Sequence, residues 1–237
     1  FMFDSADDDK FIVREAHINY TAMPLGLPNI RLGHFTLPFG LESRIDTNGR
    51  LLDYHHGRNL GTKLDWGIGL NKVLSRINYS LSYTMGGKDD PKSRQGSGLF
   101  TGRIGSLDHY DFVIGLSFYH GKLDTKDRQR LAIDMQYYYQ SWGVLAELAV
   151  GTVADQDENY YLLEVNKLSI NEQWKYYVQY MVDDKQSAQA TQRFVFAGLQ
   201  YQLDNHWYMS GAVKKRLSSS NDQHHIDLLQ LQIRYRY

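Results

Sequence analysis

The sequence predicts an all-β protein, a transmembrane antiparallel up-and-down β-barrel with about 14 visible strands. Apolar and polar residues alternate over most of the 237 residues, which is the pattern of strands with one apolar and one polar face. Each alternating segment has about 10–13 residues, close to the roughly 9–11 residues that a tilted strand needs to cross a bilayer. Short and long connections between these segments also alternate along the chain, as they do in membrane barrels.

The composition agrees with strands and excludes several other classes. Tyr (18) and Gly (20) are abundant, and 14% of the residues are aromatic, which is typical of strands and turns. A formal net charge of -1 argues against a protein that binds the nucleic-acid backbone. The absence of Cys excludes disulfides, Cys-ligated zinc, iron–sulfur clusters and c-type haem attachment. No stretch approaches the roughly 18 apolar residues that a spanning helix needs.

Thirteen segments alternate, and the chain starts with what reads as the end of one more strand. In the last segment, the odd-numbered residues of 229–237 are Leu, Leu, Ile, Tyr and Tyr, whereas the even-numbered ones are Gln and Arg. We expect residues 1–237 to be a single barrel domain whose N-terminal strands are missing, with residues 1–3 as a stub. The thirteen segments lie near 10–21, 28–38, 59–71, 76–86, 97–106, 109–121, 129–141, 142–154, 159–170, 173–183, 192–204, 206–217 and 224–237.

The connections differ between the two expected rims of the barrel. If the C-terminus lies at the periplasmic rim, that rim holds the longer connection 22–28 and otherwise only short ones, at 71–76, 106–109, 141–142, 170–173 and 204–206. The opposite rim holds mostly longer connections rich in Asp, Lys, Ser, Gln and Gly, at 38–59, 86–97, 121–129, 154–159, 183–192 and 217–224. This asymmetry is typical of a bacterial outer-membrane barrel.

Aromatic residues gather near the expected strand ends, where a polar aromatic group favours the lipid headgroup level. Those near the periplasmic rim are Trp142, Trp174, Trp207, Tyr110, Tyr201, Tyr235 and Tyr237. Those toward the other rim are Tyr83, Phe118, Tyr161 and Tyr180. A soluble β-sandwich also alternates and is the alternative interpretation, but its strands are usually only about half as long.

Residues 13–61 contain the most distinctive motifs of the chain. Residues 29–42 read NIRLGHFTLPFGLE, after VREAHINY at 13–20, and GRNLG follows at 57–61 beyond a long loop. This order resembles the phosphate-selective porin O/P-type family of Gram-negative bacteria, in which E-A-x-I-x-Y leads to R-x-G-x-F-x-x-P-F-G-L-E and then to G-R-x-x-G. The resemblance implies a 16-stranded barrel, often trimeric, that passes small solutes. Two further N-terminal strands would raise the count from fourteen to sixteen.

The polar face of the strands is expected to line a water-filled pore. It carries both signs of charge, without a ladder of one sign, so the resemblance does not carry over a preference for phosphate. The solutes are expected to be small, and anionic solutes are one alternative. The residues expected to line the pore are Glu15, Arg31, Lys63, Asp65, Asp134, Glu147, Glu164, Lys175, Lys214, Arg234 and Arg236.

The connection at 39–58 is the longest, and we expect it to fold inward and to narrow the channel. Its apolar pair Leu51-Leu52 favours partial burial. An exposed extracellular loop is the alternative, since long loops need not be functional. The residues expected at this constriction are Arg44, Asp46, Arg50, Asp53, His55, His56 and Arg58.

No motif points to a cofactor, a metal site or a catalytic centre. The pairs His55-His56 and His224-His225 point to opposite sides of an extended chain, so neither pair chelates well. Ser and His are scattered, and the sequence contains no Gly-x-Ser-x-Gly elbow, phosphate loop or dinucleotide fingerprint. We therefore expect neither an enzyme nor a cofactor.

Two functions remain open for such a barrel. The first is an outer-membrane porin for the passive diffusion of small solutes. The second is a sheath that houses a partner protein, such as a multihaem cytochrome of an electron-transfer conduit, to which a chain without Cys adds insulation only. The expected partners are membrane lipid, lipopolysaccharide, small solutes and further copies in a homotrimer, but no nucleic acid. The expected location is the bacterial outer membrane.

Overall fold

The computed structural model describes residues 2–4, 12–21, 24, 26–45, 62–88, 90–91, 97–123, 125–186, 190–218 and 228–235. These residues form fourteen strands and one short 3-10 helix. The elements are β1 (Met2–Asp4), β2 (Ile12–Tyr20), β3 (Asn29–Thr36), η1 (Leu41–Ser43), β4 (Leu64–Val73), β5 (Ile77–Thr84), β6 (Gly98–Ser106), β7 (Phe112–Leu123), β8 (Lys126–Tyr139), β9 (Trp142–Val153), β10 (Gln156–Leu168), β11 (Trp174–Lys185), β12 (Ala190–Gln202), β13 (Trp207–Ser218) and β14 (Leu228–Tyr235). No helix among the described residues is long and apolar enough to cross a membrane.

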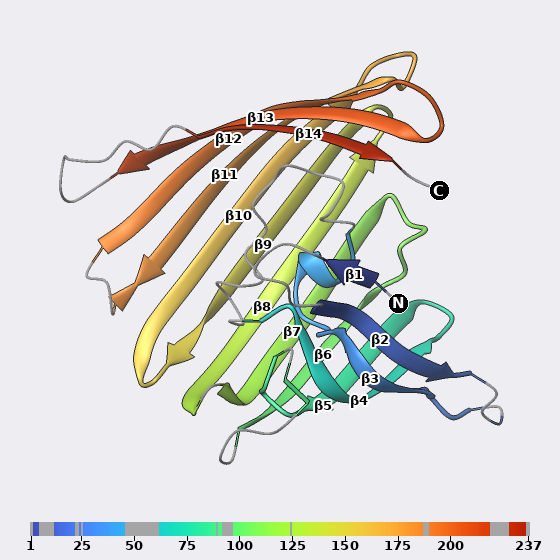
Figure 1. Cartoon of the computed structure of the whole chain (residues 1–237), viewed down its shortest axis with the longest axis vertical. Helices are drawn as coiled ribbons and strands as arrows, with labels where there is room; N and C mark the ends of the chain where they lie inside the picture. Colours follow the sequence, from blue (N-terminus) through green and yellow to red (C-terminus); the bar gives the residue numbers. More distant parts are fainter. Residues whose placement is uncertain are drawn as a thin grey trace.

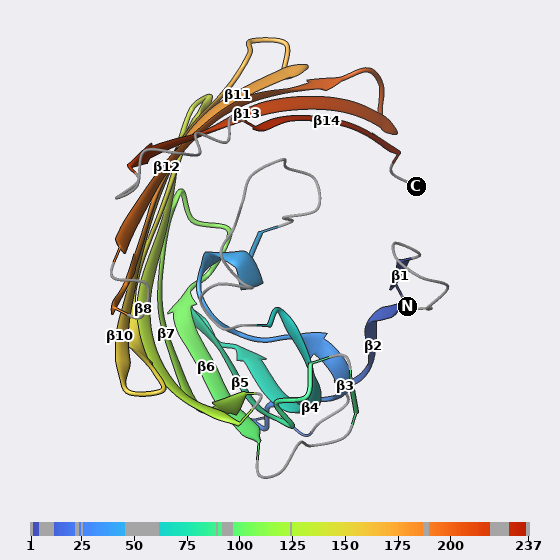
Figure 2. The ribbon, with the colours of Figure 1, turned by 60° about the vertical axis from the view of Figure 1, so that its left-hand side comes forward.

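All fourteen strands belong to one antiparallel sheet, in which each strand pairs with its neighbour in the sequence. Figures 1 and 2 show this sheet curving around to form the wall of a barrel, with β1 and β14 at its two margins. Within the described ranges, no ladder joins β1 to β14. The predicted all-β, up-and-down barrel architecture is confirmed, with one strand for each alternating segment and one for the N-terminal stub.

The two faces of the sheet differ as the alternation requires. On β8, Leu131 and Ile133 are 58% and 45% exposed, whereas Ala132 and Asp134 are 3% and 1% exposed. On β8 the exposed face is therefore apolar, and the charged Asp134 lies on the inside of the curve. This is the arrangement of a barrel in lipid, and it excludes the soluble β-sandwich, which would bury its apolar face.

Aromatic side chains pack together at the ends of neighbouring strands. The ring centroids of Trp174 and Tyr201 are 4.5 Å apart, and those of Trp207 and Tyr235 are 5.0 Å apart. These pairs join β11 to β12 and β13 to β14 at the end where the β10–β11 and β12–β13 turns lie. Such a row of aromatic rings suits the lipid headgroup level.

The connection between β9 and β10 is shorter than the sequence pattern indicated. β9 ends at Val153 and β10 begins at Gln156, so only Ala154 and Asp155 turn the chain. Both have positive φ, 50° and 63°, as the two central residues of a type I′ hairpin turn have. The longer loop expected at 154–159 is therefore wrong, because its polar residues extend β10 instead.

Residues 37–45, which follow β3, turn into the barrel. Figure 2 shows η1 within the curve of the sheet. Leu37, Phe39 and Leu41 are at most 1% exposed and pack in one apolar cluster with inward residues of the wall, among them Tyr119. The first part of the loop expected at the constriction therefore lies in the bore.

Candidate functional site

Two hydrogen bonds attach the inward segment 37–45 to the wall. The backbone N–H of Gly40 donates to Oγ of Ser117 on β7 at 3.0 Å. The next backbone N–H, that of Leu41, donates to Oε2 of Glu147 on β9 at 2.6 Å. Both bonds are buried, so the wall residues fix where the segment lies in the bore.

The local sequence Pro-Phe-Gly suits this attachment. Gly40 has φ 60°, a left-handed conformation that glycine adopts at little cost. A Cβ on Gly40 would lie 2.4 Å from Oε2 of Glu147, so only glycine brings the backbone this close to the carboxylate. The preceding Phe39 packs edge-on against Tyr119, with ring centroids 6.4 Å apart.

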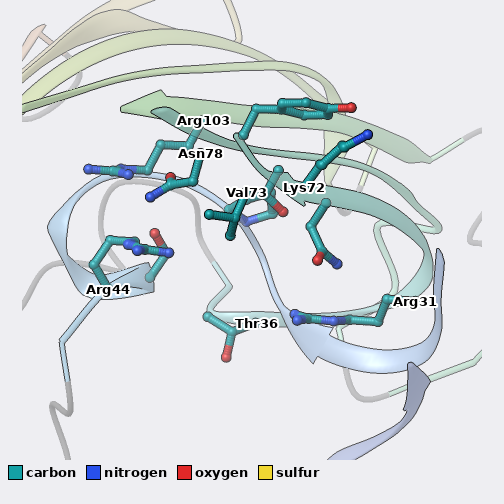
Figure 3. A pocket seen from close by; sticks show the side chains of 12 residues that line it. Arg31, Thr36, Arg44, Lys72, Val73, Asn78 and Arg103 are labelled. Atoms are coloured by element: carbon teal, nitrogen blue, oxygen red, sulfur yellow. The ribbon is translucent and has the colours of Figure 1, made fainter. Parts of the chain in front are cut away.

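A pocket of about 190 Å³ lies between this segment and the wall strands β3 to β6 (Figure 3). Arginines from three separate elements line it: Arg31 on β3, Arg103 on β6 and Arg44 directly after η1. Figure 3 shows the side chains of Arg31 and Arg44 extending toward each other across the pocket. No Asp or Glu is among the described residues that line it, and its residues with hydroxyl or amide groups are Thr36, Ser43, Asn71, Asn78, Tyr79 and Ser80.

Arg31 is the arginine of the pocket that has no direct ion pair among the described residues. Its Nε donates to Oδ1 of Asn19 at 3.0 Å, and its guanidinium carbon lies 5.6 Å from the ring centroid of Phe35. These contacts orient the side chain, but both partners are neutral. Among the described ion pairs none includes Arg31, although the carboxylate of Glu15 attracts its guanidinium electrostatically, so part of its positive charge acts on the pocket.

Arg103 is held against the wall by Asp134 of β8. Nε of Arg103 donates to Oδ2 at 3.0 Å and Nη2 donates to Oδ1 at 2.6 Å, which is the two-pronged geometry typical of arginine and carboxylate. A Cβ on Gly115 would lie 2.1 Å from Nη2, and one on Gly105 would lie 2.9 Å from Nη1. These two glycines therefore leave the room in which the guanidinium lies.

Arg44 is brought to the pocket by the inward segment and forms an ion pair with Asp108, in the connection between β6 and β7. Lys72 also borders the pocket, but Figure 3 shows its side chain directed away from the cavity. The pocket thus has three guanidinium groups, of which two are paired with carboxylates. An arrangement of this kind attracts anions and offers polar groups that replace part of their hydration.

The residues expected to line the pore fall into different environments. Arg31 lines the pocket, whereas Asp134 holds Arg103 and Glu147 holds the inward segment. Asp65 is fully buried, and its carboxylate accepts the backbone N–H groups of Trp66, Gly86 and Lys88 at 2.9, 2.6 and 3.1 Å. It therefore stabilises the segment that follows β5.

Two of the expected residues make contacts near the start and end of the inward loop. Glu15 accepts a hydrogen bond from Oγ1 of Thr36 at 2.8 Å. Nζ of Lys63 lies 3.9 Å from Oε1 of Glu42.

Four other expected residues lie apart from the arginine pocket. Glu164 is buried and accepts a hydrogen bond from Nδ2 of Asn166 at 3.0 Å. Nζ of Lys214 lies 4.6 Å from the ring centroid of Phe194. Lys175 and Arg234 are partly buried on β11 and β14. Outside the described residues lie Asp46, Arg50, Asp53, His55, His56, Arg58 and Arg236.

Sequence reasoning missed Arg103 and Ser117. Arg103 lies in a segment with weak alternation, and the glycines that make room for it are two residues away on β6 and on the next strand. Ser117 is one of many small polar residues of the wall. Within the described part of the chain, no group of three or more His, Cys, Asp and Glu is placed to hold a metal ion.

Several solved structures share this architecture, although no protein-family model and no curated protein sequence matches the chain. An anion-selective porin from Comamonas acidovorans is 14% identical, with a TM-score of 0.65 over 88% of this chain and 73% of the porin. Another porin is 13% identical, with a TM-score of 0.62 over 89% of this chain and 78% of that porin. The trimer form of OmpT, an outer membrane protein of Vibrio cholerae, is 10% identical, with a TM-score of 0.70 over 96% of this chain and 82% of OmpT. The chain therefore has the fold of an outer-membrane porin barrel.

Proposed function

We propose that the protein is an outer-membrane channel for the passive diffusion of small solutes, with a preference for anions. The observation that carries this proposal is the pocket of Arg31, Arg44 and Arg103 beside the segment that enters the bore. Charged groups at the narrow part of a pore determine which ions enter it. An anion-selective porin among the solved structures of this fold supports the same preference.

The balance of charge in the pocket suits passage better than tight binding. Arg103 and Arg44 each face a carboxylate, that of Asp134 and that of Asp108, whereas Arg31 contacts neutral partners. Among the described residues the pocket therefore has one arginine without a direct ion pair, and the carboxylate of Glu15 offsets part of its charge. A solute that is attracted by one such charge in water enters readily and also leaves readily.

We also propose a family for the protein, and membrane lipid and further copies of the chain as its partners. The motifs of residues 13–61 support membership of the phosphate-selective porin O/P-type family, whereas the mixed charges of the inner face argue against a specific preference for phosphate. The exposed apolar face fits membrane lipid and lipopolysaccharide. A homotrimer is supported by the trimer form of OmpT, and chemical crosslinking of the protein in detergent tests it.

The margins of the sheet lead to a proposal about the complete barrel. Unpaired N–H and C=O groups cost several kcal/mol each in lipid, on the order of a lost hydrogen bond or more. Among the described residues no ladder joins β1 to β14, so these margins need partner strands, and two further strands of the same protein would close a barrel of sixteen. Intact mass and peptide mapping of the native protein test this count.

The alternative function, a sheath around a multihaem cytochrome, gains no support from the described residues. Leu37, Phe39 and Leu41 of the chain itself pack against the inner wall. They take up space that a guest protein would need.

Planar-bilayer recordings test the proposed function. With a KCl gradient across the membrane, we expect discrete conductance steps and a zero-current potential of the sign given by a more permeant chloride. A folded protein that carries no current would contradict the channel. A channel that prefers potassium would contradict the anion preference alone.

A further inference from the structure

We propose that Ser117 and Glu147 are positioning residues that set the anion preference of the channel by holding Arg44 at the pocket. This inference rests on the proposed anion-conducting function. Neither residue lines the pocket. They act through the inward segment, whose backbone they bind from β7 and β9.

The path from the two wall residues to Arg44 is short and rigid. Ser117 and Glu147 accept the N–H groups of Gly40 and Leu41 at 3.0 and 2.6 Å. The helical turn η1 begins at Leu41, and the N–H of Arg44 donates back to the carbonyl of Leu41 at 2.8 Å. One turn of 3-10 helix separates the attached residue Leu41 from Arg44. The position of the Leu41 backbone therefore determines the position of the Arg44 backbone.

A third hydrogen bond stiffens the same turn. Oγ of Ser43 donates to the carbonyl of Gly40 at 2.8 Å, which ties the end of η1 to the attached residue. The side chain of Arg44 then forms an ion pair with Asp108 in the connection between β6 and β7. The attached backbone and this ion pair together orient the guanidinium at the pocket.

The attachment of the inward segment requires these acceptors because it is buried. Leu41 is 1% exposed and Glu147 is 9% exposed, so water does not readily replace the carboxylate as the acceptor of the Leu41 N–H. A buried N–H without a partner costs about as much as the hydrogen bond it has lost, or more. If the acceptor is removed, we therefore expect the segment to shift until the N–H groups find other partners, and Arg44 shifts with it.

Glu147→Ala and Glu147→Gln separate this role from simple electrostatics. Both substitutions remove the same carboxylate, so any effect of its charge alone on the anion-to-cation permeability ratio is equal in both. The Gln side chain keeps an oxygen that accepts the Leu41 N–H, whereas Ala does not. We expect Glu147→Gln to leave the anion-to-cation permeability ratio at or above that of the wild type and Glu147→Ala to lower it. The decrease is up to about fivefold if the Arg44 charge is lost from a position about 4 Å from the path of the ions.

Ser117→Ala removes the other acceptor without any change of charge, and we expect it also to lower the ratio. Ser82→Ala is the matched control, because Ser82 is a buried wall serine whose hydroxyl lies 2.5 Å from Thr101 Oγ1. Arg44→Gln gives the effect of losing the charge itself. In the double variant Glu147→Ala/Arg44→Gln we expect no further fall below Arg44→Gln, because the two residues act through one guanidinium.

The measurement is the zero-current potential of each variant in a KCl gradient, with circular dichroism and heat-modifiable gel migration to show that the barrel is folded. If Glu147→Ala does not fold, Ser117→Ala carries the test. The inference is overturned if the wild type and Arg44→Gln differ in selectivity but Ser117→Ala and Glu147→Ala retain or exceed the wild-type ratio. If the wild type shows no anion preference, the proposed function fails instead.

Discussion

Replacing Asp134 by Asn separates two effects of the buried ion pair with Arg103. Two hydrogen bonds of 3.0 and 2.6 Å join the side chains, which are 2% exposed for Arg103 and 0% for Asp134. Asp134→Asn keeps the volume of the side chain and removes its charge. The guanidinium of Arg103 then stays buried without the carboxylate that it contacts directly.

We expect stability to fall and anion selectivity to rise in this variant. Breaking a buried ion pair by changing one partner costs about 3–5 kcal/mol, so the free energy of unfolding is expected to decrease by that order. The lumen gains one positive charge, which changes the energy of an ion about 4 Å away in water by about 1 kcal/mol. This energy corresponds to an increase of about fivefold in the local anion concentration.

Unfolding by urea in lipid vesicles, followed by Trp fluorescence, measures the stability, and the zero-current potential measures the selectivity. The control is Arg103→Met/Asp134→Leu, in which both charges are absent. Apolar replacement of a buried ion pair is often neutral, so we expect this variant to unfold nearly as the wild type does. The reasoning is refuted if Asp134→Asn unfolds at the wild-type urea concentration, or if the folded variant becomes less selective for anions.

Three further predictions concern the pocket, its wall and a rim turn. Arg31→Gln removes the guanidinium of the pocket that has no direct ion pair among the described residues, and is expected to lower the anion-to-cation permeability ratio by up to about fivefold, whereas Arg31→Lys retains most of the ratio; equal ratios in Arg31→Gln and the wild type would contradict the role of Arg31. Gly115→Ala places a Cβ 2.1 Å from Nη2 of Arg103 and is expected to lower the free energy of unfolding, measured by urea titration, by about 1–3 kcal/mol. Gly211→Ala is the control and leaves this free energy unchanged, because its Cβ meets nothing closer than 3.4 Å. The pKa of Asp204 lies below its usual value because the N–H groups of His206 and Trp207 donate to its carboxylate. The stabilisation of the turn by Asp204 is therefore complete above the unfolded pKa of about 3.9 and is lost as the pH falls through the folded pKa. A normal pKa in an NMR titration of the carboxyl group would contradict this.

The alternation of side chains was sufficient to predict the strands. On β8, residues 131–134 are alternately exposed and buried, which a period of two requires in an extended chain. The charges at Arg130 and Asp134 fall on the inner face because lipid excludes them from the outer one. The same pattern could not give the length of each connection, since the turn at Ala154 and Asp155 depends on positive φ angles that polar composition does not specify.

The candidate site was only partly visible in the sequence. Arg31 and Arg44 were both expected to face the bore, one from a wall strand and one from the inward loop. Their meeting with Arg103 at one pocket depends on the neighbouring strands β3 to β6 and on the path of residues 37–45. The acceptors Ser117 and Glu147 are 77 and 106 residues from the backbone groups that they bind, and no local spacing connects them.

By itself, the sequence determined the class of the fold, the number of strands among the described residues and the two faces of most strands, because a membrane imposes one simple rule on every second residue. The tertiary structure alone decided which charges meet, which are neutralised by a partner and which stay unbalanced. Those outcomes depend on the curvature of the sheet and on a glycine that lets the backbone approach a carboxylate, and neither is a property of any single segment.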